Sequence, residues 1–168
     1  MKRPQPDEYS AFYQTYIDKI DDDVLSELQN QSESAVTFLK SIPAEKFNYA
    51  YAEGKWTIKE VLGHIIDTER IMTYRLLRFA RNDAAPLPGF EENDYIQNAH
   101  FAFLDFNVLV EELQMLRKAN MYLFNSLTEG ELERRGLANN AVLSVRALLF
   151  ILAGHLKHHL GVLRERYL

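Results

Sequence analysis

Four long segments of the chain carry apolar residues at the three- and four-residue spacing of an amphipathic helix, and this feature restricts the fold more than any other. The segments are expected to run from about Asp22 to Ile42, Thr57 to Arg81, Asp105 to Leu127 and Ser144 to Tyr167. No stretch shows the sustained alternation of a strand. Because 168 residues is an ordinary size for one domain, we expect a single all-α domain over residues 1–168, built as a four-helix bundle.

The connections between these segments suggest the order of the helices. A shorter piece, Tyr9 to Ile20, is expected to form an extra N-terminal helix packed across the bundle. The stretch from Asn82 to Leu104 is too long for a tight turn and, at about 3.3 Å per residue, can run back along a helix of about 37 Å. The second and third helices can therefore be parallel, which gives an up-down-down-up order. Residues 136–143, "GLANNAVL", are expected to form a loop.

The composition excludes several kinds of function. The chain has no cysteine, which excludes a disulfide framework, a thiolate metal site and a cysteine nucleophile. Its net charge of −5 argues against a nucleic-acid partner. No apolar run approaches the length of a membrane span, and the N-terminus lacks the apolar core of a signal peptide. We therefore expect a cytoplasmic protein without a nucleic-acid or membrane partner.

Three of the five histidines lie in the last helix, within "GHLKHHLGV" at residues 154–162. His155 and His159 take inward positions in its apolar stripe, whereas His158 lies at the edge of that stripe. His64 lies one step to the side of the apolar arc of the second helix, at the level of His159 if the two helices are antiparallel. The spacing favours a three-histidine metal site and a hydrogen-bonded histidine core about equally. His100 is expected to lie on the surface.

One acidic residue is a candidate for catalysis. Glu69 falls near the centre of the apolar arc of the second helix, where a carboxylate is costly unless it is paired. It either accepts a proton or a histidine N–H at the metal site, or forms a structural pair with an arginine such as Arg146.

Two further sets of residues are candidates for contact with a substrate. Four arginines of the second helix are expected largely opposite its apolar arc, forming a solvated face paired with carboxylates or, alternatively, a patch for an acidic substrate: Arg70, Arg75, Arg78 and Arg81. Residues 90–95, "FEENDY", are a candidate cover for the metal pocket because long ordered loops are often functional.

Three stretches resemble the DinB/YfiT-like superfamily of metalloenzymes: residues 54–83, "GKWTIKEVLGHIIDTERIMTYRLLRFARND", residues 86–95, "PLPGFEENDY", and residues 144–168, "SVRALLFILAGHLKHHLGVLRERYL". The resemblance covers nearly the whole chain. It implies an up-down-down-up bundle, often a homodimer, with His64, His155 and His159 as the ligands of a divalent metal. Zinc or nickel is the ion that the resemblance implies.

The resemblance also implies a reaction class. Characterised relatives include bacillithiol S-transferases and a mycothiol-dependent isomerase, so we expect a metal-dependent enzyme that transfers a low-molecular-weight thiol to an electrophile. With water in place of the thiol, the same site would act as a hydrolase. The alternative is a non-catalytic dimeric metal-binding bundle that serves as a stress-response or interaction module.

Overall fold

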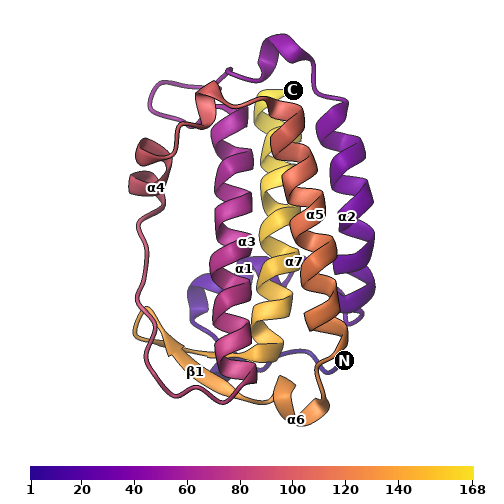
Figure 1. Ribbon diagram of the computed structural model, residues 1–168, viewed down its shortest axis with the longest axis vertical. Coiled ribbons are helices and arrows are strands. Elements are labelled where there is room, and N and C mark those ends of the chain that lie inside the picture. Colours follow the sequence, from indigo (N-terminus) through magenta and orange to yellow (C-terminus); the bar gives the residue numbers. More distant parts are fainter.

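Four long helices stand side by side in the computed structural model, which describes residues 1–168 (Figure 1). They are α2 (Val24–Lys40), α3 (Ile58–Ala80), α5 (Phe106–Asn125) and α7 (Val145–Val162). This architecture confirms the expected all-α four-helix bundle, and each long helix begins within two residues of its predicted start. No helix combines the length and the apolar character needed to cross a membrane.

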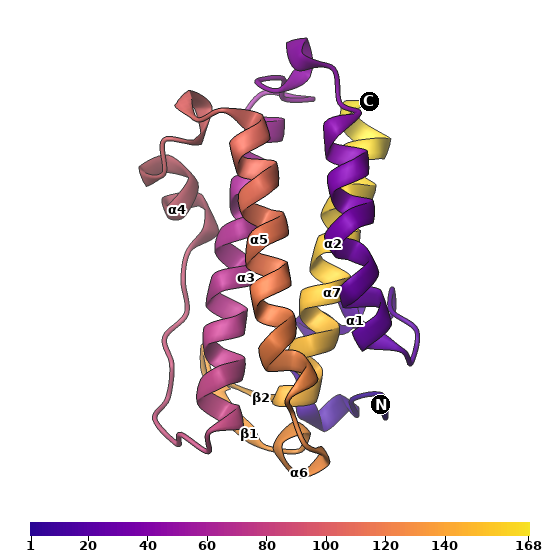
Figure 2. The ribbon, with the colours of Figure 1, turned by 45° about the vertical axis from the view of Figure 1, so that its right-hand side comes forward.

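The order of the helices is up-down-down-up, as predicted. Helices α2 and α3 each pack against both α5 and α7. Figure 2 shows the connection after α3 rising along the outside of that helix, so that α5 begins beside the start of α3 and runs parallel to it. Helix α7 returns in the opposite direction, which makes it antiparallel to α3 and brings their histidines to one level.

Side chains at the helix starts explain where the long helices begin. The Thr57 hydroxyl accepts a hydrogen bond from the Glu60 backbone N–H, and the Glu60 carboxylate accepts one from the Thr57 N–H, which completes a capping box before α3. The Asp105 side chain caps α5, and the Ser144 hydroxyl caps α7. These capping side chains determine the residue at which each of these three helices begins.

Two connections contain more structure than predicted. The long second connection includes α4 (Glu92–Asn98) and a 3₁₀ turn at Phe101–Phe103. The prediction of a loop at residues 136–143 is wrong, because β1 (Arg135–Ala138) and β2 (Ala141–Ser144) form an antiparallel hairpin. Both turn residues, Asn139 and Asn140, have positive φ angles of 51° and 58°, the conformation that a two-residue hairpin turn requires. A short α6 (Glu129–Leu132) precedes the hairpin.

The N-terminal segment packs on α7, as expected, although its helix is shorter than predicted. A 3₁₀ turn at Ala11–Tyr13 leads into the single turn of α1 (Gln14–Ile17). The approach is so close that a Cβ atom at Gly154 would lie 2.1 Å from the Tyr16 carbonyl oxygen. Glycine at residue 154 therefore allows α1 to lie directly beside the histidines of α7.

A layer of buried polar side chains divides the hydrophobic core into two clusters. One cluster includes Met72, Phe124 and Leu152, and the other includes Ile65, Leu109 and Leu156. Between them lie buried polar residues from all four long helices, namely Gln31, Thr68, Glu69, Arg117 and His155. This polar layer contains the main buried ion pair and His155, beside which the other two candidate metal ligands lie.

Candidate metal centre

The three histidines predicted to bind a metal meet at one point between α3 and α7. The Nε2 atom of His155 lies 2.9 Å from Nε2 of His64 and 3.1 Å from Nε2 of His159. One ring nitrogen from each of the three residues lies within 4.8 Å of the others. The side chains of His64 and His155 are buried, and that of His159 is half-buried. The antiparallel helices therefore bring together the group that the residue spacing predicts.

The environment keeps the three imidazoles neutral. Burial lowers the pKa of His64 to about 4. Burial, with a contribution from the neighbouring His64 and His158, lowers the pKa of His159 to about 3. The pKa of His155 is also held well below its usual value, chiefly by burial. Neutral imidazole is the form that offers a lone pair to a metal.

Hydrogen bonding alone does not satisfy this arrangement. The His155 Nε2 atom carries either one proton or one in-plane lone pair, so it can form one hydrogen bond but not two. Two ligands at 2.0–2.1 Å from one ion stand about 2.8–3.4 Å apart in octahedral or tetrahedral geometry. The two shortest contacts, at 2.9 and 3.1 Å, fall in that range. The donor set therefore fits a divalent transition metal.

Aromatic rings hold the triad from two sides. The Trp56 ring lies 4.8 Å from the His64 ring, between centroids, and the Tyr16 ring lies edge-on to His155 at 5.5 Å. His158 lies outside the triad and packs on Tyr16, at 5.4 Å. The exposed His100 is in the second connection, on the surface as expected.

The candidate catalytic residue Glu69 lies in a hydrogen-bond network with α5. Its two carboxylate oxygens each accept a hydrogen bond of 2.8 Å from the Arg117 guanidinium. Asn120 donates a third hydrogen bond to Glu69, and none joins Glu69 to the histidines. The expected pairing of Glu69 with Arg146 is wrong, because Arg146 pairs with Glu8 in the N-terminal segment instead. The geometry of Glu69 is that of a structural ion pair.

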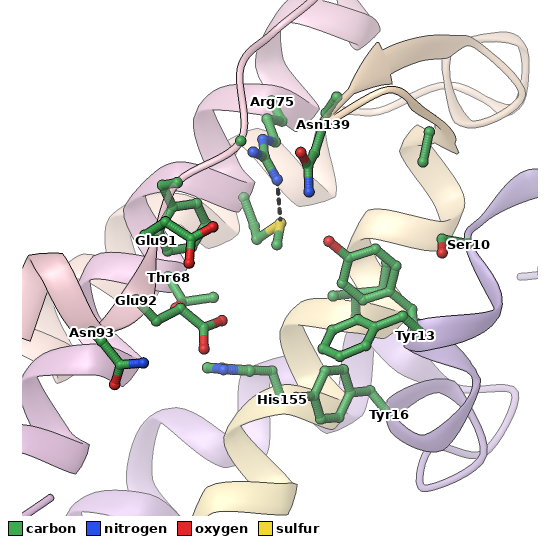
Figure 3. A pocket seen from close by; sticks show the side chains of 17 residues that line it. Ser10, Tyr13, Tyr16, Thr68, Arg75, Glu91, Glu92, Asn93, Asn139 and His155 are labelled. Atoms are coloured by element: carbon green, nitrogen blue, oxygen red, sulfur yellow. Dashed lines mark hydrogen bonds between the residues drawn. The ribbon is translucent and has the colours of Figure 1, made fainter.

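A cavity of about 410 Å³ opens beside the triad, with His155 in its wall. Five parts of the chain enclose it: the N-terminal segment, α3, the second connection, the hairpin and α7. Figure 3 shows Glu92 and His155 at one end of this cavity and Arg75 and Asn139 at the other, with the tyrosine rings along one side. A second cavity of about 300 Å³ reaches His159, and Asn93 lines both. The metal centre is therefore accessible to a small molecule.

The cover that residues 90–95 were expected to provide is present over residues 90–93. Figure 3 shows the Glu92 carboxylate directed into the cavity, near the His155 ring. Burial and the adjacent Glu91 raise the pKa of Glu92. Glu92 rather than Glu69 is thus the carboxylate that lies beside His155 in the cavity. Glu92 lies outside the helices that carry the histidines, so helical periodicity could not identify it from the sequence.

Three of the four arginines, namely Arg70 and Arg78 of α3 and its C-cap residue Arg81, form the paired surface face that the sequence suggests. Arg70 pairs with Glu112, Arg78 with Asp83 and Arg81 with Glu131. Arg75 differs, because its side chain is buried in the wall of the cavity. The row formed by His64, Thr68, Met72 and Arg75, at helical steps of four, four and three, could have indicated this position.

Comparison with known proteins agrees with this description. Residues 27–163 match the sequence profile of the DinB superfamily. A protein of Oceanobacillus iheyensis, provisionally named a metal-dependent hydrolase, is 30% identical over 129 residues, which cover 73% of this chain and 71% of that protein. A protein of Geobacillus kaustophilus with the same kind of name is 27% identical over 127 residues, covering 73% and 70% of the two chains.

Solved structures share the fold at low sequence identity. YfiT from Bacillus subtilis, described as a probable metal-dependent hydrolase with an unusual four-helix bundle topology, has a TM-score of 0.71 and 18% identity. The match covers 98% of this chain and 90% of YfiT. A mycothiol-dependent maleylpyruvate isomerase has a TM-score of 0.69 and 12% identity, covering 86% of this chain and 61% of the isomerase.

Proposed function

The chain belongs to the DinB superfamily, and from this premise we propose that it is a metal-dependent hydrolase whose ion is held by His64, His155 and His159. One observation carries the proposal: three neutral imidazoles converge at the wall of an accessible cavity. The curated relatives named as metal-dependent hydrolases support the reaction class.

The three histidines would supply three of the four or more positions that a catalytic metal site uses. When bound, a divalent ion such as zinc or nickel supplies Lewis acidity, which lowers the pKa of a coordinating water and polarises a carbonyl group. Trp56 and Tyr16 fix the rings of His64 and His155, so that the ligands need little rearrangement to hold the ion.

Glu92 has the position of a proton acceptor. It lies at the same end of the cavity as His155, and burial and the adjacent Glu91 raise the pKa of its carboxyl group, the direction that favours a proton acceptor. In the proposed reaction, Glu92 takes the proton from the attacking water and later returns it to the leaving group. Glu92→Gln is therefore expected to lower kcat by about 100-fold or more while the bound metal is retained.

Thiol transfer to an electrophile is a second candidate. The fold match to a mycothiol-dependent isomerase favours it, and an ion held by the same three imidazoles could take a thiolate in place of water. The small-molecule substrate would then be a low-molecular-weight thiol. The two candidates use the same site and differ in the nucleophile.

The test uses protein purified without a histidine tag and then loaded with zinc or nickel. Elemental analysis gives the metal content, p-nitrophenyl acetate reports hydrolysis, and bacillithiol with monochlorobimane reports thiol transfer. His64→Ala and His159→Ala are expected to lower metal affinity by more than about 100-fold and to abolish turnover. His100→Ala, which changes an exposed histidine, is the matched control and is expected to retain both.

Each outcome separates the candidates. Metal-dependent ester hydrolysis supports the hydrolase, and metal-dependent thiol consumption alone supports the transferase. A protein that binds one ion and does neither overturns both enzymes in favour of a metal-binding bundle without catalysis. If both histidine variants retain the parent's metal, the triad is wrong.

A further inference from the structure

Arg75 is a buried charge without a carboxylate partner. Its side chain is 3% exposed, yet no aspartate or glutamate oxygen lies within 4.0 Å of it. Its hydrogen bonds go to neutral groups: Nη2 donates to the Pro88 carbonyl at 2.8 Å, and Nη1 points at the Met72 sulfur at 3.6 Å. A sulfur is a weak acceptor, so much of the hydrogen-bonding capacity of this guanidinium is not used.

The other groups around Arg75 do not neutralise its charge. Burial lowers the pKa of the guanidinium, and the groups that oppose this effect are the hydroxyls of Tyr13 and Tyr95. The Phe90 ring lies 5.7 Å away and offers a cation–π contact. A tyrosine hydroxyl and a ring stabilise a buried charge far less than a carboxylate would. Arg70 and Arg78 of the same helix, and its C-cap residue Arg81, all have carboxylate partners.

The guanidinium faces the cavity that leads to the metal centre. Figure 3 shows Arg75 and Asn139 together at the end of the cavity opposite to Glu92 and His155. Arg75 follows Thr68 by seven residues on α3, which corresponds to about 10 Å along the helix axis. Aromatic side chains, Tyr13 and Tyr16 among them, line the space between the two ends.

A second buried polar group in the same wall also has no partner. The Oγ1 atom of Thr68 is fully buried and makes no hydrogen bond, although the residue is 3% exposed and lies one helical turn after His64. Native proteins rarely leave such an atom unsatisfied unless a water or a ligand completes it. The cavity wall therefore includes Thr68, one helical turn from His64, and carries a cation at the far end.

We propose that this cavity binds a small carboxylic acid, with the carboxylate on Arg75 and the reacting group about 10 Å away beside Thr68 and the three histidines. A planar guanidinium pairs with a carboxylate through two parallel hydrogen bonds. This inference rests on the proposed function for the identity of the reacting end. It names the substrate class of that site: a molecule with an apolar body and one acidic end.

A carboxylate suits this cavity better than a phosphate group does. One arginine supplies a single positive charge, and Glu91 and Glu92 also line the cavity. A phosphate dianion on Arg75 would keep an excess negative charge in a cavity that already holds two carboxylates, whereas a carboxylate is neutralised by one guanidinium. The balance of charge thus selects a monoanionic end group.

The test measures binding to metal-free protein, so it is independent of turnover. Isothermal titration calorimetry at pH 8 compares 4-phenylbutanoate with its uncharged amide, 4-phenylbutanamide. The carboxylate is expected to bind at least about tenfold more tightly than the amide, as charge-assisted hydrogen bonds do. Arg75→Gln is expected to remove this preference. Arg78→Gln, which changes a carboxylate-paired arginine on the same helix, is the matched control and should retain it.

Unaltered protein provides a second measurement in case Arg75→Gln does not fold. Bound 4-phenylbutanoate should protect Arg75, but not Arg78, from modification by phenylglyoxal, as read by peptide mass spectrometry. Equal binding of acid and amide, or no binding of the acid at millimolar concentration, would overturn the proposal. Displacement of the acid by inorganic phosphate more readily than by acetate would overturn the choice of a carboxylate. Hydrolysis can fail while this preference holds, so the two proposals are separately testable.

Discussion

The two halves of the polar layer that crosses the bundle differ in completeness. In the half between α3 and α5, Glu69 and Arg117 form a two-point ion pair, and Gln31 and Asn120 supply further hydrogen bonds. In the half between α3 and α7, three imidazoles face one another, and the Thr68 hydroxyl has no partner. Glu69 and Arg117 in one half and His64 and His155 in the other are all buried.

This difference separates a structural role from a functional one. Buried polar groups cost free energy unless they are paired, and the Glu69–Arg117 half is paired within the chain. The histidine half lacks what a metal ion and a substrate would supply. Burial and charge alone do not distinguish the two halves, because Glu69 and His155 are almost equally buried. The presence or absence of a hydrogen-bond or ion-pair partner within the chain distinguishes them.

The largest expected effect comes from breaking the complete half. Glu69→Leu removes the carboxylate and leaves the Arg117 guanidinium buried without its partner, so we expect the free energy of unfolding to fall by about 3–5 kcal/mol. Urea denaturation measures this change. Glu111→Leu, which changes an exposed glutamate on α5, is the control and is expected to have little effect.

The same variant also tests whether Glu69 acts at the metal. We expect the folded fraction of Glu69→Leu to bind as much zinc as the parent protein, and Glu69→Leu combined with Arg117→Met to be less destabilised than Glu69→Leu alone. Loss of zinc without loss of stability would instead assign Glu69 to the metal site.

Much of the fold and the histidine group could be predicted because both follow from helical periodicity. The spacing of His155 and His159 places them on one face of a helix, and the length of the connection at residues 82–104 allows α3 and α7 to be antiparallel. Those two facts bring His64 to the same level. The geometry of the triad thus depends on regular elements, whose rise per residue is fixed.

What could not be predicted depends on contacts between segments distant in sequence. Helical spacing shows that Glu69 faces inward, but the rotation of α5 against α3 decides that Arg117 rather than Arg146 is its partner. The sequence does not show that the second connection covers Arg75, whose guanidinium donates a hydrogen bond to the Pro88 carbonyl. The hairpin around Asn139 has strands of four residues, too short for an alternating pattern to be recognised.

A smaller effect on the free energy of unfolding is expected when the buried histidines become protonated. The folded-state pKa of His64, about 4, lies below the ordinary value of 6.5, so the unfolded chain takes up a proton first as the pH falls. The stability that His64 contributes is therefore present above pH 6.5 and lost between pH 6.5 and 4. For His64 alone, metal-free protein should lose about 2 kcal/mol of unfolding free energy between pH 7.5 and pH 5.

Denaturant unfolding in the presence of a chelator, at both pH values, measures this loss. His64→Gln should reduce the difference, and His100→Gln, at an exposed position, should leave it unchanged. An equal pH dependence in all three proteins would show that the buried imidazoles do not govern acid sensitivity.

The smallest effect has the most informative sign, because it compares two threonines of α3. Thr68→Val removes a buried hydroxyl that has no partner, so it should stabilise the protein by about 1 kcal/mol. Thr73→Val removes a hydroxyl that accepts a hydrogen bond of 3.1 Å from Asn120 in the complete half, so it should destabilise by about 1 kcal/mol. Thermal denaturation of metal-free protein compares the two. If both variants are destabilised, the Thr68 hydroxyl has a partner within the chain, and the contrast between the two halves fails at that residue.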